Sequence, residues 1–287
     1  MQAFQEHYFT TDDGRRLYYR DYSGPASLTP VFCVPGLQTN SRVFENLAPN
    51  IAERRRVLCI DPRGKGRSEY DTDPNNYTLR RDGSDLYQMA LAAHAARGVV
   101  LGASRGGLAG LFLAAKTQLV AGLILVDIGP QFEFSAVERL SNDIAPDMSF
   151  ASWEDAAAAL KRGHGTWFPN LPDRKWVFWA KAKYREENGR IVPDSDPQMT
   201  VRIRKANAEL SSDAILALWQ MFRSVPAIPI LVLRGEHSDV LLEQTVQKMQ
   251  SIRPDIAAVT VKGCGHMPFL DEPESLAAID EFLARID

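Results

Sequence analysis

Six short apolar runs, separated by stretches with helical periodicity, most strongly constrain how this chain can fold. The runs cover residues 31–34, 57–60, 99–101, 123–126, 230–233 and 257–261. Continuous apolar runs are typical of strands that are covered on both faces, and the helical stretches between them supply that cover. A turn signal at residues 12–14 also predicts an N-terminal hairpin of residues 7–10 and 16–20. We therefore predict an α/β fold with a mostly parallel sheet of eight strands.

One long segment, residues 130–226, interrupts this alternation of strands and helices. It contains no convincing strand, and all five tryptophans fall within it. We predict that it is a mainly helical cap, inserted after the sixth core strand into a core made of residues 1–129 and 227–287. Because the insertion leaves and re-enters at the carboxyl ends of the strands, where open sheets bind their ligands, we expect it to cover the functional site.

Composition excludes several classes of partner. The chain is 45% hydrophobic and 24% charged, which is ordinary for a soluble globular protein with a sizeable core. A net charge of −3 gives no general attraction to nucleic acid or to an anionic membrane, so we expect neither as a partner. The first residues lack the pattern of a signal peptide, and no apolar run approaches 18 residues. We expect a cytoplasmic protein.

The three cysteines and a basic glycine-rich turn both favour structural roles. Cys33, Cys59 and Cys264 lack metal-type spacing, and two of them fall in strand-like runs, so we predict reduced core thiols. We expect no metal and no cofactor. Residues 64–67 contain two glycines, a lysine and an arginine but match no phosphate-loop pattern, and we predict a simple turn after a strand.

The chemistry centres on Ser104, in a G-x-S-x-G pattern between an apolar run and a helical pattern. A strand that reverses abruptly into a helix needs residues without bulk around the turn, and Gly102 and Gly106 meet that need. Such a turn exposes the serine hydroxyl at a helix N-terminus, where free N–H groups stabilise an anion. We predict that Ser104 is a nucleophile.

A serine nucleophile needs an imidazole base and a carboxylate that orients it. His266 is the best base, because it lies in a glycine-flanked loop directly after the last apolar run. For the acid there are two candidates. Asp239 gives the chain order serine, acid, histidine expected for this topology, and we select it. Asp127, which follows the run 123–126, is the alternative.

The other histidines are assigned structural roles. His7, His94 and His164 are predicted to be surface or packing residues. His237, beside the selected acid, is predicted to be a loop residue, with a role in the pocket left open. An oxyanion hole requires two backbone N–H groups, one after the nucleophile and one in the loop after an early strand. We predict that Arg105 and Leu37 supply them.

These motifs together resemble the α/β-hydrolase superfamily over nearly the full chain. The matching segments are residues 34–36, 61–68, 102–107, 234–239 and 263–266, with 271–274 opening the final helix. Within the superfamily, the chain is most similar to capped esterases, enol-lactonases and carbon–carbon bond hydrolases. It departs in having Pro35 where the superfamily usually has histidine, and in placing Asp239 four residues past Gly235 where three is commoner. Serine at the elbow argues against haloalkane dehalogenases and epoxide hydrolases, which use aspartate there.

The predicted function is that of a serine hydrolase cleaving a small carboxylic ester or lactone through an acyl-enzyme. Two alternatives stay open: a carbon–carbon bond hydrolase of ring-cleavage products, and a non-catalytic ligand-binding protein on the same scaffold. Candidate substrate-binding residues are Arg105, Trp153 and Trp179. The Arg105 guanidinium could receive a carboxylate, or it could form a structural ion pair with the cap, and most of the tryptophans are expected to pack within the cap.

Overall fold

The computed structural model describes residues 4–142, 148–208 and 211–287; the parts of the predicted insertion at 143–147 and 209–210 lie outside the described residues. Eight strands form one sheet in the order β1-β2-β4-β3-β5-β6-β9-β10. They are β1 (Gln5–Thr10), β2 (Arg16–Tyr22), β3 (Val31–Val34), β4 (Val57–Asp61), β5 (Gly98–Ala103), β6 (Val120–Val126), β9 (Ile230–Gly235) and β10 (Ala257–Val261). β2 runs antiparallel to both β1 and β4, and all other neighbouring strands of this sheet are parallel. The predicted sheet and all six apolar runs are confirmed.

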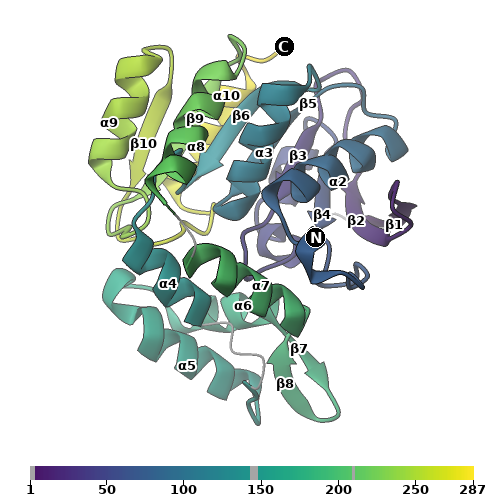
Figure 1. Cartoon of the computed structure of the whole chain (residues 1–287), viewed down its shortest axis with the longest axis vertical. Coiled ribbons are helices and arrows are strands. Elements are labelled where there is room, and N and C mark those ends of the chain that lie inside the picture. Colours follow the sequence, from purple (N-terminus) through teal and green to yellow (C-terminus); the bar gives the residue numbers. More distant parts are fainter. Residues whose placement is uncertain (1–3, 143–147, 209–210) are drawn as a thin grey trace.

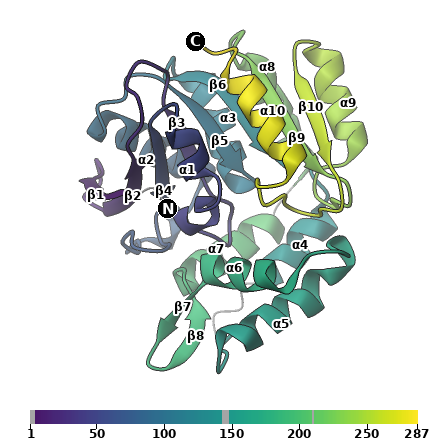
Figure 2. The ribbon, with the colours of Figure 1, turned by 180° about the vertical axis from the view of Figure 1, so that it is seen from behind.

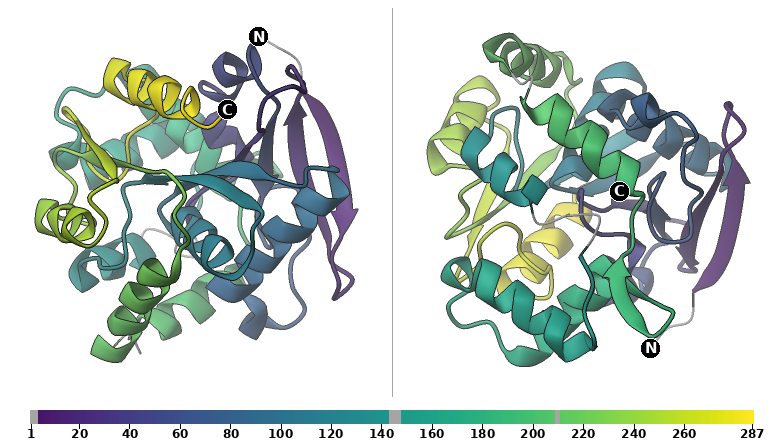
Figure 3. Two further views of the ribbon diagram at one scale, coloured as in Figure 1. Left: turned by 90° about the horizontal axis from the view of Figure 1, so that it is seen from above. Right: turned by 60° about the horizontal axis from the view of Figure 1, so that its bottom comes forward.

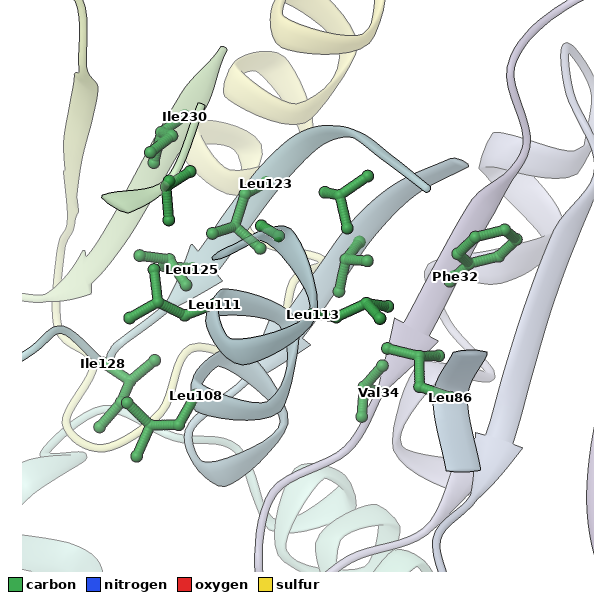
Figure 4. Packing of buried hydrophobic residues seen from close by; sticks show 14 of the residues in the cluster. Phe32, Val34, Leu86, Leu108, Leu111, Leu113, Leu123, Leu125, Ile128 and Ile230 are labelled. Carbon is green, nitrogen blue, oxygen red and sulfur yellow. The ribbon is translucent and has the colours of Figure 1, made fainter. Parts of the chain in front are cut away.

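Helices cover both faces of the sheet, which explains why its strands are apolar throughout (Figures 1 and 2). On one face lie α2 (Leu79–Ala92), α3 (Arg105–Lys116), α8 (Ser212–Ser224) and α9 (Glu243–Ile252), and on the other α1 (Ala48–Ala52) and α10 (Pro273–Leu283). Figure 4 shows Leu108 and Leu111 of α3 among side chains of β6 and Ile128, all of them buried. This packing holds the start of α3 rigidly at the end of β5.

A second layer lies beyond the carboxyl ends of the strands (Figures 1 and 3). It contains α4 (Phe134–Asn142), α5 (Trp153–His164), α6 (Asp173–Lys183) and α7 (Pro197–Ala208). Three short 3₁₀ turns complete the described elements: η1 (Ser41–Phe44), η2 (Pro74–Asn76) and η3 (Gly165–Trp167). Within the described residues, no helix is long and apolar enough to span a bilayer.

Two features of the predicted insertion differ from the sequence-based expectation. A two-stranded antiparallel sheet, β7 (Tyr184–Glu187) and β8 (Arg190–Pro193), lies where no strand was predicted. Its turn is Asn188-Gly189, and both residues have positive φ, the geometry that a two-residue hairpin requires. The Asn-Gly pair is a typical hairpin turn, but the polar residues of the two flanking strands do not show the apolar pattern expected of strands. Helix α8 also packs on the sheet side, with Trp219 and Phe222 in the core cluster, although the predicted insertion extends to residue 226.

Candidate active site

Ser104 occupies a strained turn between β5 and α3. Its φ is +49°, which is rare for a residue with a side chain. The two glycines of the motif are required because a side chain would not fit at either position. A Cβ at Gly102 would lie 2.5 Å from the carbonyl oxygen of Gly106, and one at Gly106 would overlap the carbonyl oxygen of Val34. The Ser104 N–H donates to Val126 at 2.9 Å, which ties the turn to β6. The chain can therefore turn sharply enough to present the serine hydroxyl at the sheet edge.

His266 links the serine to a carboxylate. The loop between β10 and α10 places its Nε2 at 2.9 Å from Ser104 Oγ and its Nδ1 at 2.7 Å from Asp127 Oδ2. An ionised carboxylate only accepts hydrogen bonds, so Nδ1 carries the proton and Nε2 is left to accept from the serine hydroxyl. The His266 side chain is 6% exposed. This geometry suits proton transfer from Ser104.

The acid beside His266 is Asp127, so the selection of Asp239 is corrected. β6 is the neighbour of β5 in the sheet, and Asp127 directly follows β6, next to the strand that carries the serine. Asp239 lies in the loop after β9, one strand further away, and its carboxylate pairs with Arg139 of α4 at 2.6 Å. The partner of His266 is therefore the candidate that the sequence left as the alternative.

The surroundings of Asp127 supply hydrogen-bond donors to its carboxylate and fix its orientation. The residue is fully buried, and its φ of +52° turns the chain at the end of β6. The Gly235 N–H donates to Oδ1 at 2.8 Å, and the Ser238 hydroxyl donates to Oδ2 at 2.5 Å. The last residue of β9 and the loop after it thus supply hydrogen-bond donors to the carboxylate, and buried polar groups need such partners.

The predicted oxyanion donors flank the serine. Gly36 lies so close to Ser104 that a Cβ on it would be 3.4 Å from the serine Cβ, and Leu37 and Arg105 both line the cavity at the nucleophile. Arg105 begins α3, where backbone N–H groups lack partners within the helix. The roles of Leu37 and Arg105 as oxyanion donors remain predictions.

The turn of residues 64–67 contacts the loop that contains Gly36 and Leu37. Gly64 and Gly66 have positive φ, as a tight turn requires, and Lys65 between them is buried. Its Nζ donates to the Gly36 carbonyl at 2.6 Å. Burial lowers the pKa of Lys65 to about 7. The turn thus has a structural role, and its contact with Gly36 could not be predicted from a local sequence pattern.

A cavity of about 470 Å³ opens onto Ser104 and His266, with mainly apolar walls from both layers of the molecule. Trp179 lines it, and its role in substrate binding stays a prediction, whereas Trp153 is not among the lining residues and packs in the cluster of α5 and α6. Arg105 lines the cavity, but its guanidinium forms an ion pair with Asp82 of α2 at 2.8 Å. The structural alternative for Arg105 is therefore correct in kind, although its partner lies in the core and not in the cap.

The cysteines and the other described histidines lie in environments that indicate packing or surface roles. Cys33, Cys59 and Cys264 are buried free thiols. Among the described residues, no group of three or more potential ligands could hold a metal ion. His164 is buried against Trp167 and Trp179. His237 is exposed beside Glu236, and His7 stacks on Tyr19. In the described structure, these side chains are not linked to Ser104.

Comparison with known proteins agrees with this arrangement. The chain is 30% identical over 280 residues to a 3-hydroxybutyrate-oligomer hydrolase of Cupriavidus necator, covering 93% of this chain and 92% of that protein. It is 26% identical over 250 residues to a 2-(acetamidomethylene)succinate hydrolase of Mesorhizobium japonicum, covering 86% and 85%. Each similarity spans most of both proteins.

Solved structures and a family model extend the comparison. The fold matches the crystal structure of an alpha/beta hydrolase from Novosphingobium aromaticivorans with a TM-score of 0.92 and 37% identity, over 99% of both chains. The model of the alpha/beta hydrolase fold family matches residues 29–273, which include the elbow serine, Asp127 and His266. The chain is therefore a member of the alpha/beta hydrolase fold family.

Proposed function

We propose that the protein is a serine hydrolase that cleaves a carboxylic ester or lactone through an acyl-enzyme. The observation that supports this most is the continuous chain of hydrogen bonds from Ser104 through His266 to Asp127. His266 takes the serine proton as Ser104 attacks the carbonyl carbon, and the buried Asp127 carboxylate stabilises the imidazolium that forms.

The rest of the reaction uses the same groups. The N–H groups of Leu37 and Arg105 stabilise the tetrahedral oxyanion, and their preorganisation at a helix start and a tight loop lowers the barrier. His266 then protonates the leaving alkoxide, which yields an acyl ester on Ser104. In the second half, His266 activates a water molecule that releases the acid and restores the serine.

The named activities of two relatives support hydrolysis of a small molecule. One acts on oligomers of 3-hydroxybutyrate and the other on 2-(acetamidomethylene)succinate. The cavity of about 470 Å³ suits a substrate of moderate size with an apolar part.

The first prediction concerns Ser104. In Ser104→Ala, turnover of nitrophenyl esters of graded chain length and of a set of lactones should fall by a factor on the order of 10³ or more, because the acyl-enzyme cannot form. The melting temperature should stay close to that of wild type, since only the small hydroxyl of the partly exposed Ser104 is removed. Steady-state kinetics and calorimetry check both values.

A fluorophosphonate probe supplies an independent readout. It should label the wild-type protein and leave Ser104→Ala unlabelled. Undiminished ester turnover in the variant, or labelling that survives the loss of Ser104, would show that the nucleophile is wrongly assigned.

A further inference from the structure

Arg202 of α7 is a second polar feature of the cavity that contains Ser104. The residue is partly buried and lines the cavity wall. Its Nε is buried and has no hydrogen-bond partner among the described residues. A buried donor without a partner costs free energy, so a group that supplies an acceptor there gains from binding.

The charges around the cavity are unbalanced. Arg105 is neutralised by Asp82, and the residues that line the cavity in the described structure include no aspartate or glutamate. Arg202 therefore places a guanidinium at a mainly apolar wall that supplies no carboxylate. In such surroundings an anion is attracted more strongly than it would be in water.

Helix α7, which carries Arg202, packs close to the predicted oxyanion loop. Ile203, the next residue along, packs in a buried cluster with Tyr77 and Met199, and Leu37 of the predicted oxyanion loop packs against that cluster. Thr39 of the same loop also lines the cavity, and its Oγ1 is buried without a hydrogen-bond partner in the described part of the chain. The wall beside the oxyanion loop thus offers two unused polar groups that the proton-transfer chain does not involve.

We propose that Arg202 binds a carboxylate of the substrate, so that the preferred substrates are esters that also carry a free carboxylate, such as half-esters of dicarboxylic acids. The inference rests on the proposed function, because it assumes that Ser104 attacks the ester carbonyl in this cavity. The guanidinium forms charge-assisted hydrogen bonds to the carboxylate, and Thr39 donates its hydroxyl to a polar atom nearby. The apolar walls contact the carbon chain between the two ends.

The test compares two substrates that differ in one charge: the mono-4-nitrophenyl ester of adipic acid, and the same compound with its free carboxylate methylated. Wild type should favour the anionic ester by about tenfold or more in kcat/KM, after subtraction of spontaneous hydrolysis. Arg202→Met should lose about 10- to 100-fold on the anionic ester, mainly in KM, and much less on the neutral one. Arg202→Lys should recover part of the loss.

Lys205 provides a matched control on the same helix. It is exposed and is not among the cavity-lining residues, so Lys205→Met removes one positive charge without touching the wall. This variant should keep the wild-type preference. Adipate should inhibit cleavage of the neutral ester competitively in wild type and in Lys205→Met, and much more weakly in Arg202→Met.

The outcomes separate this inference from the proposed function. A wild-type enzyme that cleaves both esters through Ser104 without preferring the anionic one would overturn the role of Arg202 and leave the hydrolase intact. Equal losses on both substrates in Arg202→Met would show a purely structural role and also overturn it. Turnover of both esters that persists in Ser104→Ala would overturn the proposed function itself.

Discussion

At the scale of single residues, the orientation of His266 depends on which strand end supplies the acid. Asp127 and Asp239 both follow strands of the sheet, but only Asp127 reaches Nδ1, at 2.7 Å. Asp239 is engaged by Arg139 and is 28% exposed at its side chain. The two aspartates therefore provide a matched pair for testing which one orients the imidazole of His266.

Substitution of each aspartate by asparagine should separate them. In Asp127→Asn, kcat should fall by a factor on the order of 10³–10⁴, because an amide can donate to Nδ1 and so stabilise the wrong tautomer of His266. In Asp239→Asn, kcat should stay within about threefold of wild type, since only a partly exposed ion pair is weakened. Ester kinetics on both variants decide between the acids, and a large loss confined to Asp239→Asn would restore the original selection.

At the scale of elements, the loops after β3 and β4 are joined by a buried amine. Lys65 Nζ donates to the carbonyl of Gly36, whose peptide unit also contains the Leu37 N–H. Burial lowers the pKa of Lys65 to about 7; Arg105 of α3 acts in the same direction, and Asp82 of α2 and Asp61 of β4 oppose it. Because a neutral amine still donates, the contact with Gly36 persists as the charge is lost.

This buried amine makes stability depend on pH in a defined direction. Between pH 7 and the ordinary lysine pKa of 10.5, the unfolded chain binds a proton that the native state does not, so this residue makes the free energy of unfolding rise with pH. The contribution has a slope of at most about 1.4 kcal/mol per pH unit. Lys65→Met should lack it. Urea unfolding of both proteins between pH 6 and 9 measures the difference, with the exposed Lys205→Met as the control that should follow wild type.

At the scale of the whole molecule, local sequence patterns predict the strands of the core sheet but not which of those strands are neighbours. Continuous apolar runs and an elbow flanked by glycines indicate local structure, and Ser104 and His266 were identified from them. The choice between Asp127 and Asp239 depended on the sheet order, which pairs β6 directly with β5. The ion pair of Arg105 with Asp82 depends on how segments distant in the sequence pack together, and so does the burial of the Arg202 Nε, which has no partner within the described residues. No local pattern could reveal either feature.

The most extensive such contact centres on Arg63, in the motif that follows β4. Its guanidinium is almost fully buried and binds three carboxylates: Asp85 of α2 through Nε at 2.9 Å, Asp13 of the N-terminal hairpin at 2.8 Å, and Asp71. It thereby joins the hairpin, the loop after β4 and α2. Burial raises the pKa of Asp85 to about 6 despite this contact, whereas the hydrogen bond from Arg63 lowers the pKa of Asp13. Arg63 is therefore the cation that contacts all three acids, while Arg81 lies 3.7 Å from Asp13.

Removing that cation should destabilise the fold as a whole. Arg63→Met should lower the free energy of unfolding by about 3–5 kcal/mol, because it leaves buried carboxylates uncompensated. Arg67, four residues on, provides the control: it is 49% exposed and pairs with the exposed Glu6, so Arg67→Met should cost less than about 1 kcal/mol. The deficit of Arg63→Met should shrink as pH falls from 7 to 5, because the abandoned acids can then take up protons. Urea unfolding of the three proteins at both pH values measures these differences, and similar losses in the two variants would contradict a central role for Arg63.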